Sequence, residues 1–199
     1  PPFDVVLMDL QMPGMDGLTL YREIRRLRAE TVAVLVTAYA SASTAREAVA
    51  AGAWQVVPKP VDVPRLLGLI DEALGQPLVM VVDDDDNFCV TLWDLLRECG
   101  YRVSVAHDAS EAAERLRDGT RVILVDLVLP GGGGAEVCRQ VREADPAARI
   151  VLVTGHRVEL ESKAGHLQAE VVDAVCYKPL DVPGFLGTLK QFVSSPGDA

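Results

Sequence analysis

Short apolar runs, each followed by an amphipathic stretch, recur along the chain. The runs "VVLMD", "AVLVT" and "WQVVPK" are continuous apolar segments of strand length, which is typical of parallel strands that are buried on both faces. Between these runs, apolar residues return every three or four positions, as they do in an amphipathic helix. The alternation of strands and helices predicts an α/β protein in which helices cover both faces of a parallel sheet.

Two predicted helices in the first part of the chain carry a clear apolar stripe. The helix near residues 17–29 places three residues on its stripe, namely Leu20, Ile24 and Leu27. The helix near 63–74 has a longer stripe, made of Val63, Leu66, Leu67, Ile70 and Leu74. We expect both stripes to face a core.

Further along, "LVMVVD" and "YRVSVA" are predicted strands, and helices are expected near 87–99 and 109–118. The first of these helices turns four apolar residues inward, namely Phe88, Leu92, Leu95 and Leu96.

Part of the chain is a repeat. "DVVLMDLQMPG" matches "RVILVDLVLPG", and "VVPKPVDVPRLLGLIDEAL" matches "VCYKPLDVPGFLGTLKQFV". The residues 78–119 have no counterpart. We therefore predict a partial unit at 1–75, a linker at 76–77, a complete unit of five βα pairs at 78–194, and a disordered tail at 195–199.

Polar residues stand at the ends of the predicted strands of the complete unit, namely Asp83, Asp84, Asp126, Thr154 and Lys178. Because parallel strands present their carboxyl ends at one edge of a sheet, we expect these residues to converge. Three neighbouring carboxylates need a cation, and Mg²⁺ prefers oxygen ligands. A lysine and a hydroxyl beside that metal suit a phosphoryl group, and one carboxylate can act as its acceptor.

The apolar strand followed by "DD", and then "VDLVLPG", "VLVTG" and "YKP", resemble in order and spacing the receiver domain of two-component response regulators. The resemblance covers 78–194, and it covers the last three βα units of the pattern in 1–75. It implies a flavodoxin-like, doubly wound sheet of five parallel strands in the order 2-1-3-4-5. It also implies that Asp126 accepts phosphate from a phosphohistidine on a histidine kinase or a histidine phosphotransfer domain.

The resemblance further implies a set of ligands. Mg²⁺ would be held by Asp83, Asp84, Asp126 and the backbone carbonyl of Val128. The phosphoryl group would be bound by Thr154 and Lys178. The equivalents in the partial unit are Asp9, Thr37 and Lys59.

Some family features are expected in this chain and one is missing. The peptide bonds Lys59–Pro60 and Lys178–Pro179 are expected to be cis. The aromatic residue that the family carries three positions before the lysine is replaced by Val56 and Val175.

Other conspicuous residues have plainer interpretations. Asp85 and Asp86 are expected to cap the helix that begins near Asn87, where negative charge is favourable. The run "GGGG" at 131–134 is expected to be a flexible loop, and the histidines have no metal-ligand spacing.

Charge and composition restrict the partners. The net charge of −10 argues against binding of nucleic acid or of an anionic membrane by this chain. No apolar run reaches the length of a transmembrane helix. The four cysteines form no C-x-x-C pair, which favours reduced thiols in a cytoplasmic protein. Because the chain begins at Pro1 and opens almost directly into a strand, we expect it to be a piece of a longer protein.

The partial unit lacks the acidic pair, and three sources for its missing half are open. The half could lie upstream, a partner chain could supply it in a homodimer, or residues 78–119 could serve the first copy. We expect 78–119 to pair with 120–194 instead.

Two functions remain open. The first is a phosphoacceptor with no enzymatic activity beyond its own phosphorylation and dephosphorylation, either in a tandem regulator or in the tail of a hybrid histidine kinase. The alternative is a pseudo-receiver that serves as a dimerisation or interaction module. A haloacid-dehalogenase-type phosphatase is disfavoured, because its second aspartate would stand where the chain has Gln11 or Val128.

Overall fold

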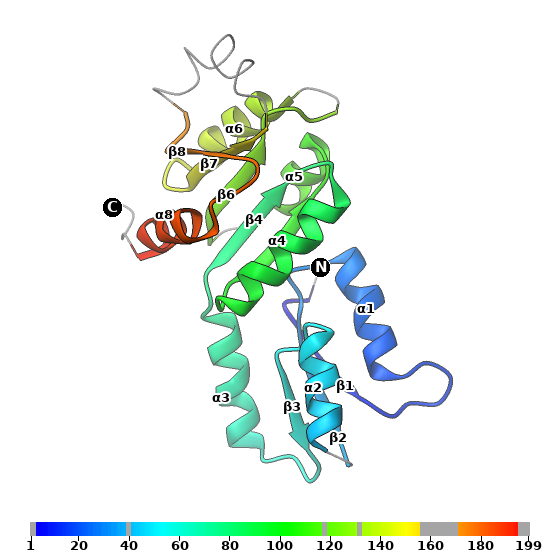
Figure 1. The fold of residues 1–199 in the computed structure, drawn as a ribbon. Helices are drawn as coiled ribbons and strands as arrows, with labels where there is room; N and C mark the ends of the chain where they lie inside the picture. Colours follow the sequence, from blue (N-terminus) through cyan, green and yellow to red (C-terminus); the bar gives the residue numbers. More distant parts are fainter. Residues whose placement is uncertain (1–2, 39–40, 117–118, 131–132, 156–170, 195–199) are drawn as a thin grey trace. The chain divides into compact units, whose positions relative to one another are not determined.

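The computed structural model describes residues 3–38, 41–116, 119–130, 133–155 and 171–194, which form two separate sheets (Figure 1). One sheet has three strands in the order β1-β2-β3, and the other has five in the order β5-β4-β6-β7-β8. The chain divides into two compact units, one around each sheet.

The five-stranded unit follows the predicted alternation of strands and helices. Its elements are β4 (Leu78–Val82), α4 (Asp86–Glu98), β5 (Arg102–Ala106), α5 (Ala109–Arg115), β6 (Thr120–Asp126), α6 (Gly133–Ala144), β7 (Arg149–Thr154), β8 (Ala174–Tyr177) and α8 (Val182–Ser194). The pairs β4–β6, β6–β7 and β7–β8 are parallel. The strand order is the predicted 2-1-3-4-5, so the predicted fold class is confirmed.

Strand β4 decides which copy the residues 78–119 complete. It pairs with β6, and Val82 lies opposite Val125. The expected pairing of 78–119 with 120–194 is therefore confirmed, and the alternative in which this segment serves the first copy is wrong.

The five-stranded sheet is buried on both faces. Alternate strand residues join α5 and α6 in one apolar cluster that includes Met80, Val82, Ile123, Ala112 and Val137. The intervening strand residues are also buried, as are residues of α4 and α8 that lie outside this cluster, namely Val79, Val81, Leu92, Leu96, Phe185 and Leu189. Different helices therefore cover the two faces. Of the stripe predicted on α4, Leu92 and Leu96 are buried, whereas Phe88 and Leu95 are half-buried.

The three-stranded unit contains β1 (Val5–Asp9), α1 (Gly17–Leu27), β2 (Val32–Thr37), α2 (Ala42–Ala50), β3 (Gln55–Pro58) and α3 (Val63–Leu74). Strand β2 pairs in parallel with β1 and β3, and all of its residues are buried. A small core joins Met8, Tyr21 and Leu35.

The stripes predicted on α1 and α3 are only partly buried. Leu27 is 71% exposed because α1 ends at this residue. On α3, Leu66 and Ile70 are half-buried, but Val63, Leu67 and Leu74 are 57%, 55% and 38% exposed, so the stripe faces a core only in part. Val63 lies in the first turn of α3, and the matching Val182 of α8 is also 40% exposed. For Leu67 and Leu74, the reason is that the three-stranded sheet stops at β1 and leaves less sheet for the helix to cover.

Two further observations complete the fold. The peptide bonds Lys59–Pro60 and Lys178–Pro179 are cis, as predicted. Among the described residues, no helix combines the length and the apolar character that a membrane crossing needs. The tail predicted at 195–199 lies outside the described residues. Two of the three histidines, His156 and His166, also lie outside them.

Candidate functional site

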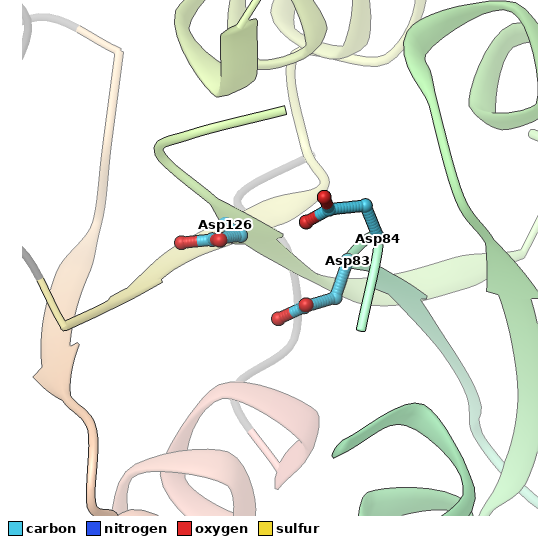
Figure 2. A group of neighbouring side chains, drawn as sticks. All are labelled: Asp83, Asp84 and Asp126. Atoms are coloured by element: carbon cyan, nitrogen blue, oxygen red, sulfur yellow. The ribbon is translucent and has the colours of Figure 1, made fainter. Parts of the chain in front are cut away.

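Three carboxylates meet at the carboxyl edge of the five-stranded sheet. Asp83 and Asp84 directly follow β4, and Asp126 is the last residue of the neighbouring strand β6. One carboxylate oxygen of each lies within 4.8 Å of the others (Figure 2). The structure thus brings together the acidic residues that the sequence analysis had assigned to a metal site.

The carboxylate of Asp126 is buried, and within the described part of the chain one of its oxygens lacks a hydrogen-bond donor. Burial raises the pKa of its carboxyl group, and the charge of Asp83 raises it further, although the ammonium of Lys178 and the amides of Leu127 and Val128 oppose this. Its Oδ1 atom is buried and has no hydrogen-bond partner among the described residues. A buried carboxylate oxygen that lacks a donor is suited to a cation, because a cation compensates the lost hydration.

Lys178 reaches into this cluster from the residue that follows β8. Its backbone amide donates to the carbonyl of Thr154 over 2.9 Å. Its Nζ donates to Asp83 Oδ2 over 2.6 Å and lies 3.6 Å from Asp126 Oδ2. The lysine is therefore at the predicted place, but its shortest contact is with the aspartate that follows β4 rather than with Asp126.

Phe88, which the sequence pattern places on the inward face of its helix, is a neighbour of the site. The Nζ atom of Lys178 lies 4.2 Å from the centroid of its ring, within the range of a cation–π interaction. Phe88 lies in the first turn of α4, two residues after the last aspartate of the acidic run. An aromatic residue at this position is the one signal in the sequence that could have pointed to it.

Thr154 lies at the predicted strand end, next to the strand that carries Asp126. Thr154 is fully buried at the end of β7, the strand beside β6. Val128 lies two residues after Asp126, and its side chain is 42% exposed. The role of its carbonyl as a metal ligand stays a prediction.

A close approach of α6 to β6 explains one glycine of the run "GGGG". The amide of Gly134 donates to the carbonyl of Leu127 over 3.0 Å, and a Cβ atom at this position would overlap the carbonyl oxygen of Asp126. Gly17 makes the same approach to Asp9 in the partial unit. The expectation of a flexible loop is wrong for 133–134, which begin α6, while 131–132 lie outside the described residues. The matching positions of Gly17 and Gly134 in the repeat were the signal for this role.

The second half of the acidic run has the predicted capping role. Asp85 Oδ1 accepts hydrogen bonds from the amides of Asn87 and Phe88, and Asp86 is the first residue of α4. The run is thus divided between the cluster and the helix terminus.

The strand ends of the partial unit are different. Asp9 Oδ2 accepts a hydrogen bond from Lys59 Nζ over 2.6 Å, and this bond, together with one from the amide of Gln11, lowers the pKa of Asp9. Thr37 is buried at the end of β2. Within the described part of the chain, three metal-ligating side chains gather only at Asp83, Asp84 and Asp126. Asp9 is therefore placed like Asp126, but it lacks the acidic pair.

Known proteins share this arrangement of motifs and strands. The model of the response regulator receiver domain matches residues 1–71 and 79–188. The chain belongs to the response regulator receiver domain family. A response regulator receiver protein of Anaeromyxobacter sp. is 34% identical over 179 residues, which are 87% of this chain and 75% of that protein. The sensory transduction protein RegX3 of Mycolicibacterium smegmatis is 35% identical over 88 residues, which are 44% of this chain and 38% of that protein.

Solved receiver structures match the same fold. A CheY-like receiver domain from Methanospirillum hungatei is 27% identical with a TM-score of 0.52, and the match covers 59% of this chain and 93% of that one. The response regulator TrrA of Thermotoga maritima, solved in complex with Mg²⁺ and BeF, is 25% identical with a TM-score of 0.53; the match covers 59% of this chain and 99% of that one. Mg²⁺ prefers oxygen ligands, and the carboxylates of Asp83, Asp84 and Asp126 in the present chain provide them.

Proposed function

We propose that residues 78–194 form a receiver that accepts a phosphoryl group on Asp126 in a reaction that depends on Mg²⁺. The proposal is carried by the cluster of Asp83, Asp84 and Asp126, whose oxygens lie within 4.8 Å of one another beside the ammonium of Lys178. Three carboxylates and one ammonium leave an excess of negative charge, which a divalent cation offsets.

The chemistry follows from the positions of the side chains. A carboxylate oxygen of Asp126 attacks the phosphorus atom of a phosphohistidine, the P–N bond breaks, and an acyl phosphate forms. The electron pair of the broken bond stays on the imidazole nitrogen, which takes up a proton.

Other side chains stabilise the transferred group. Bound Mg²⁺, held by Asp83, Asp84, Asp126 and the carbonyl of Val128, would neutralise charge on the phosphoryl oxygens. Lys178 moves from Asp83 to a phosphoryl oxygen, and the hydroxyl of Thr154 donates to another.

The phosphoryl donor in this proposal is a histidine kinase or a histidine phosphotransfer domain. The protein acts in the cytoplasm, either as a tandem regulator or as the tail of a hybrid histidine kinase, and it catalyses only its own phosphorylation and dephosphorylation. The four cysteines are all free thiols, which supports a reducing compartment. The match in two segments supports a boundary at residues 76–77 between a partial receiver and a complete one.

The alternative function, a pseudo-receiver that serves as a dimerisation or interaction module, is favoured only for residues 1–75. There the phosphoacceptor equivalent Asp9 is paired with Lys59, and no acidic pair stands beside it among the described residues. Among the described residues of this half, no group of three carboxylates could hold Mg²⁺.

The test is phosphorylation by a small donor. The purified chain is incubated with acetyl phosphate and Mg²⁺, and its intact mass is measured. We expect one phosphoryl group on the wild-type chain and on Asp9→Asn, and none on Asp126→Asn or when a chelator removes Mg²⁺. An adduct that survives in Asp126→Asn would contradict the proposal.

A further inference from the structure

Asp83 is bound to the end of β5 through both of its backbone polar groups. Its amide donates to the carbonyl of Ala106, the last residue of β5, over 3.0 Å. Its carbonyl accepts a hydrogen bond from Nδ1 of His107, which follows Ala106, over 3.1 Å. Because a carbonyl oxygen can only accept, Nδ1 carries the proton in this contact. The imidazole therefore supplies the donor that a backbone amide supplies in a continued parallel ladder.

The main chain of His107 is held from the other side by α5. Its amide donates to Oε2 of Glu111 over 3.1 Å. Glu111 lies in the first turn of α5, which the side chain of Asp108 caps, and its Oε2 also lies 3.5 Å from the guanidinium of Arg115. Helix α5 thus fixes the backbone of His107, while the imidazole reaches the residue that follows β4.

A second and weaker donor contacts the same carbonyl. The thiol of Cys89 on α4 donates to the carbonyl oxygen of Asp83 over 3.3 Å. Both residues are 2% exposed, and a thiol is a weak donor. Without the imidazole, this carbonyl would be left to the thiol or to water, and neither fixes its direction as firmly as a second held donor does.

The direction of this carbonyl affects two predicted metal ligands at once. The carbonyl belongs to the planar peptide unit between Asp83 and Asp84, so a rotation of that unit changes how the two side chains lie relative to each other. One carboxylate oxygen of each lies within 4.8 Å of the other and of an oxygen of Asp126 (Figure 2). Because Mg²⁺ requires a nearly octahedral arrangement of ligands, a small displacement of two of them weakens its binding.

We propose that His107 is a positioning residue of the metal site. Its Nδ1–H group holds the peptide unit between Asp83 and Asp84 in the orientation that binds Mg²⁺. The residue acts through Asp83 rather than as a ligand. Its effect on phosphorylation rests on the proposed function, whereas its effect on the binding of Mg²⁺ does not.

The test compares three substitutions that place a donor differently. The side-chain amide of His107→Asn stands close to the place of Nδ1, that of His107→Gln stands close to the place of Nε2, and His107→Leu has no donor. Calorimetry measures the binding of Mg²⁺ to each whole chain at one pH. We expect His107→Leu and His107→Gln to lower the affinity about tenfold or more, because a partner that orients a metal ligand is lost. We expect His107→Asn to keep most of the affinity.

The rate of phosphorylation by acetyl phosphate, followed against the Mg²⁺ concentration, is a second readout. In His107→Leu, the half-saturating concentration of Mg²⁺ should rise about tenfold, whereas the rate at saturating Mg²⁺ should fall much less. A general loss of folding would instead lower the rate at every concentration. His107→Gln keeps a polar side chain at this half-exposed position and replaces the leucine variant if that variant does not fold.

The outcomes separate this inference from the proposed function. Wild-type affinity for Mg²⁺ in His107→Leu, or in His107→Gln if the leucine variant does not fold, would overturn the positioning role. An equal loss in His107→Asn and His107→Leu would also overturn it, because the donor would then not be the cause. A wild-type chain that binds Mg²⁺ but takes up no phosphoryl group would refute the proposed function, and the calorimetric comparison would still decide the role of His107. A wild-type chain that binds no Mg²⁺ would overturn both.

Discussion

Lys178 makes its shortest side-chain contact with Asp83, although its proposed partner is the phosphoryl group on Asp126. A metal ion held by Asp83 would compete with this contact, so the ammonium of Lys178 would then need another neighbour to stay beside the acidic cluster. The ring of Phe88 is a further neighbour of Nζ, and it places no formal charge there. We therefore regard Phe88 as a residue that positions Lys178.

The Phe88→Leu substitution tests this positioning role. A cation–π contact at a half-buried site contributes about 1 kcal/mol, which corresponds to about a fivefold change in rate. We expect Phe88→Leu to slow phosphorylation by acetyl phosphate about fivefold at saturating Mg²⁺, and Phe88→Tyr to keep the wild-type rate. Intact-mass time courses measure both. A Phe88→Leu protein that matches the wild-type rate would contradict the role.

The sequence predicted the charged residues of the site better than their neighbours. Asp83, Asp84 and Asp126 could be placed together because the ends of parallel strands converge. Phe88 could not, because an apolar residue on a helical stripe is typical of a core. The contact between Lys178 and Asp83 depends on side-chain geometry, which no sequence pattern fixes.

At the scale of elements, Asp173 joins three segments of the complete unit. Its carboxylate accepts hydrogen bonds from Arg142 on α6, from Arg149 at the start of β7, and from the amide of Ile150. Burial raises the pKa of Asp173, but these donors outweigh burial and hold the pKa below its usual value. The side chain is 14% exposed, so the charge is shielded from solvent.

The substitution Asp173→Asn should destabilise the complete unit in a way that depends on pH. We expect a loss of about 2 kcal/mol in the free energy of unfolding near neutral pH, because two charge-assisted hydrogen bonds weaken. Since the folded-state pKa is lowered, this stability is present above the ordinary carboxyl pKa of 3.8 and is lost as the pH falls through the lower value. Urea unfolding at several pH values measures the difference. The exposed Glu143→Gln on the same helix serves as the control, and a pH-independent difference would be inconsistent with this account.

The contact between α6 and β6 depends on a glycine. An added methyl group at Gly134 meets the backbone of Asp126, whereas Gly187 in α8 has nothing within 4 Å of such a group. We expect Gly134→Ala to lower the free energy of unfolding by about 2 kcal/mol or more and to reduce phosphorylation. Gly187→Ala should raise stability by a few tenths to about 1 kcal/mol through helix propensity. Thermal unfolding and acetyl phosphate labelling distinguish the two, and equal effects would refute the close approach.

Most elements could be predicted from the sequence, because the period of the apolar residues changes between strands and helices. The helix at 63–74 matches α3 at both ends, and 87–99 differs from α4 by one residue at each end. The burial of α3 could not be predicted in this way. Its stripe is suited to a core, but the sheet that would form that core ends at β1.

At the scale of the whole molecule, the repeat predicted the two units, and the structure supplies the pairing that the repeat left open. Residues 78–119 could in principle have served either copy, because both present the same strand pattern. The pairing of β4 with β6 gives the acidic pair to Asp126 and leaves Asp9 with Lys59. The central claim is therefore that this chain, as it stands, has one phosphoacceptor.

Mapping the modified residue tests this claim most directly. The chain is phosphorylated with acetyl phosphate and Mg²⁺, the acyl phosphate is reduced with borohydride to the alcohol, and the altered residue is located by peptide mass spectrometry. The account predicts that the altered residue is Asp126 and that Asp9 is unmodified. Modification at Asp9 alone, or equal modification at Asp9 and Asp126, would contradict it.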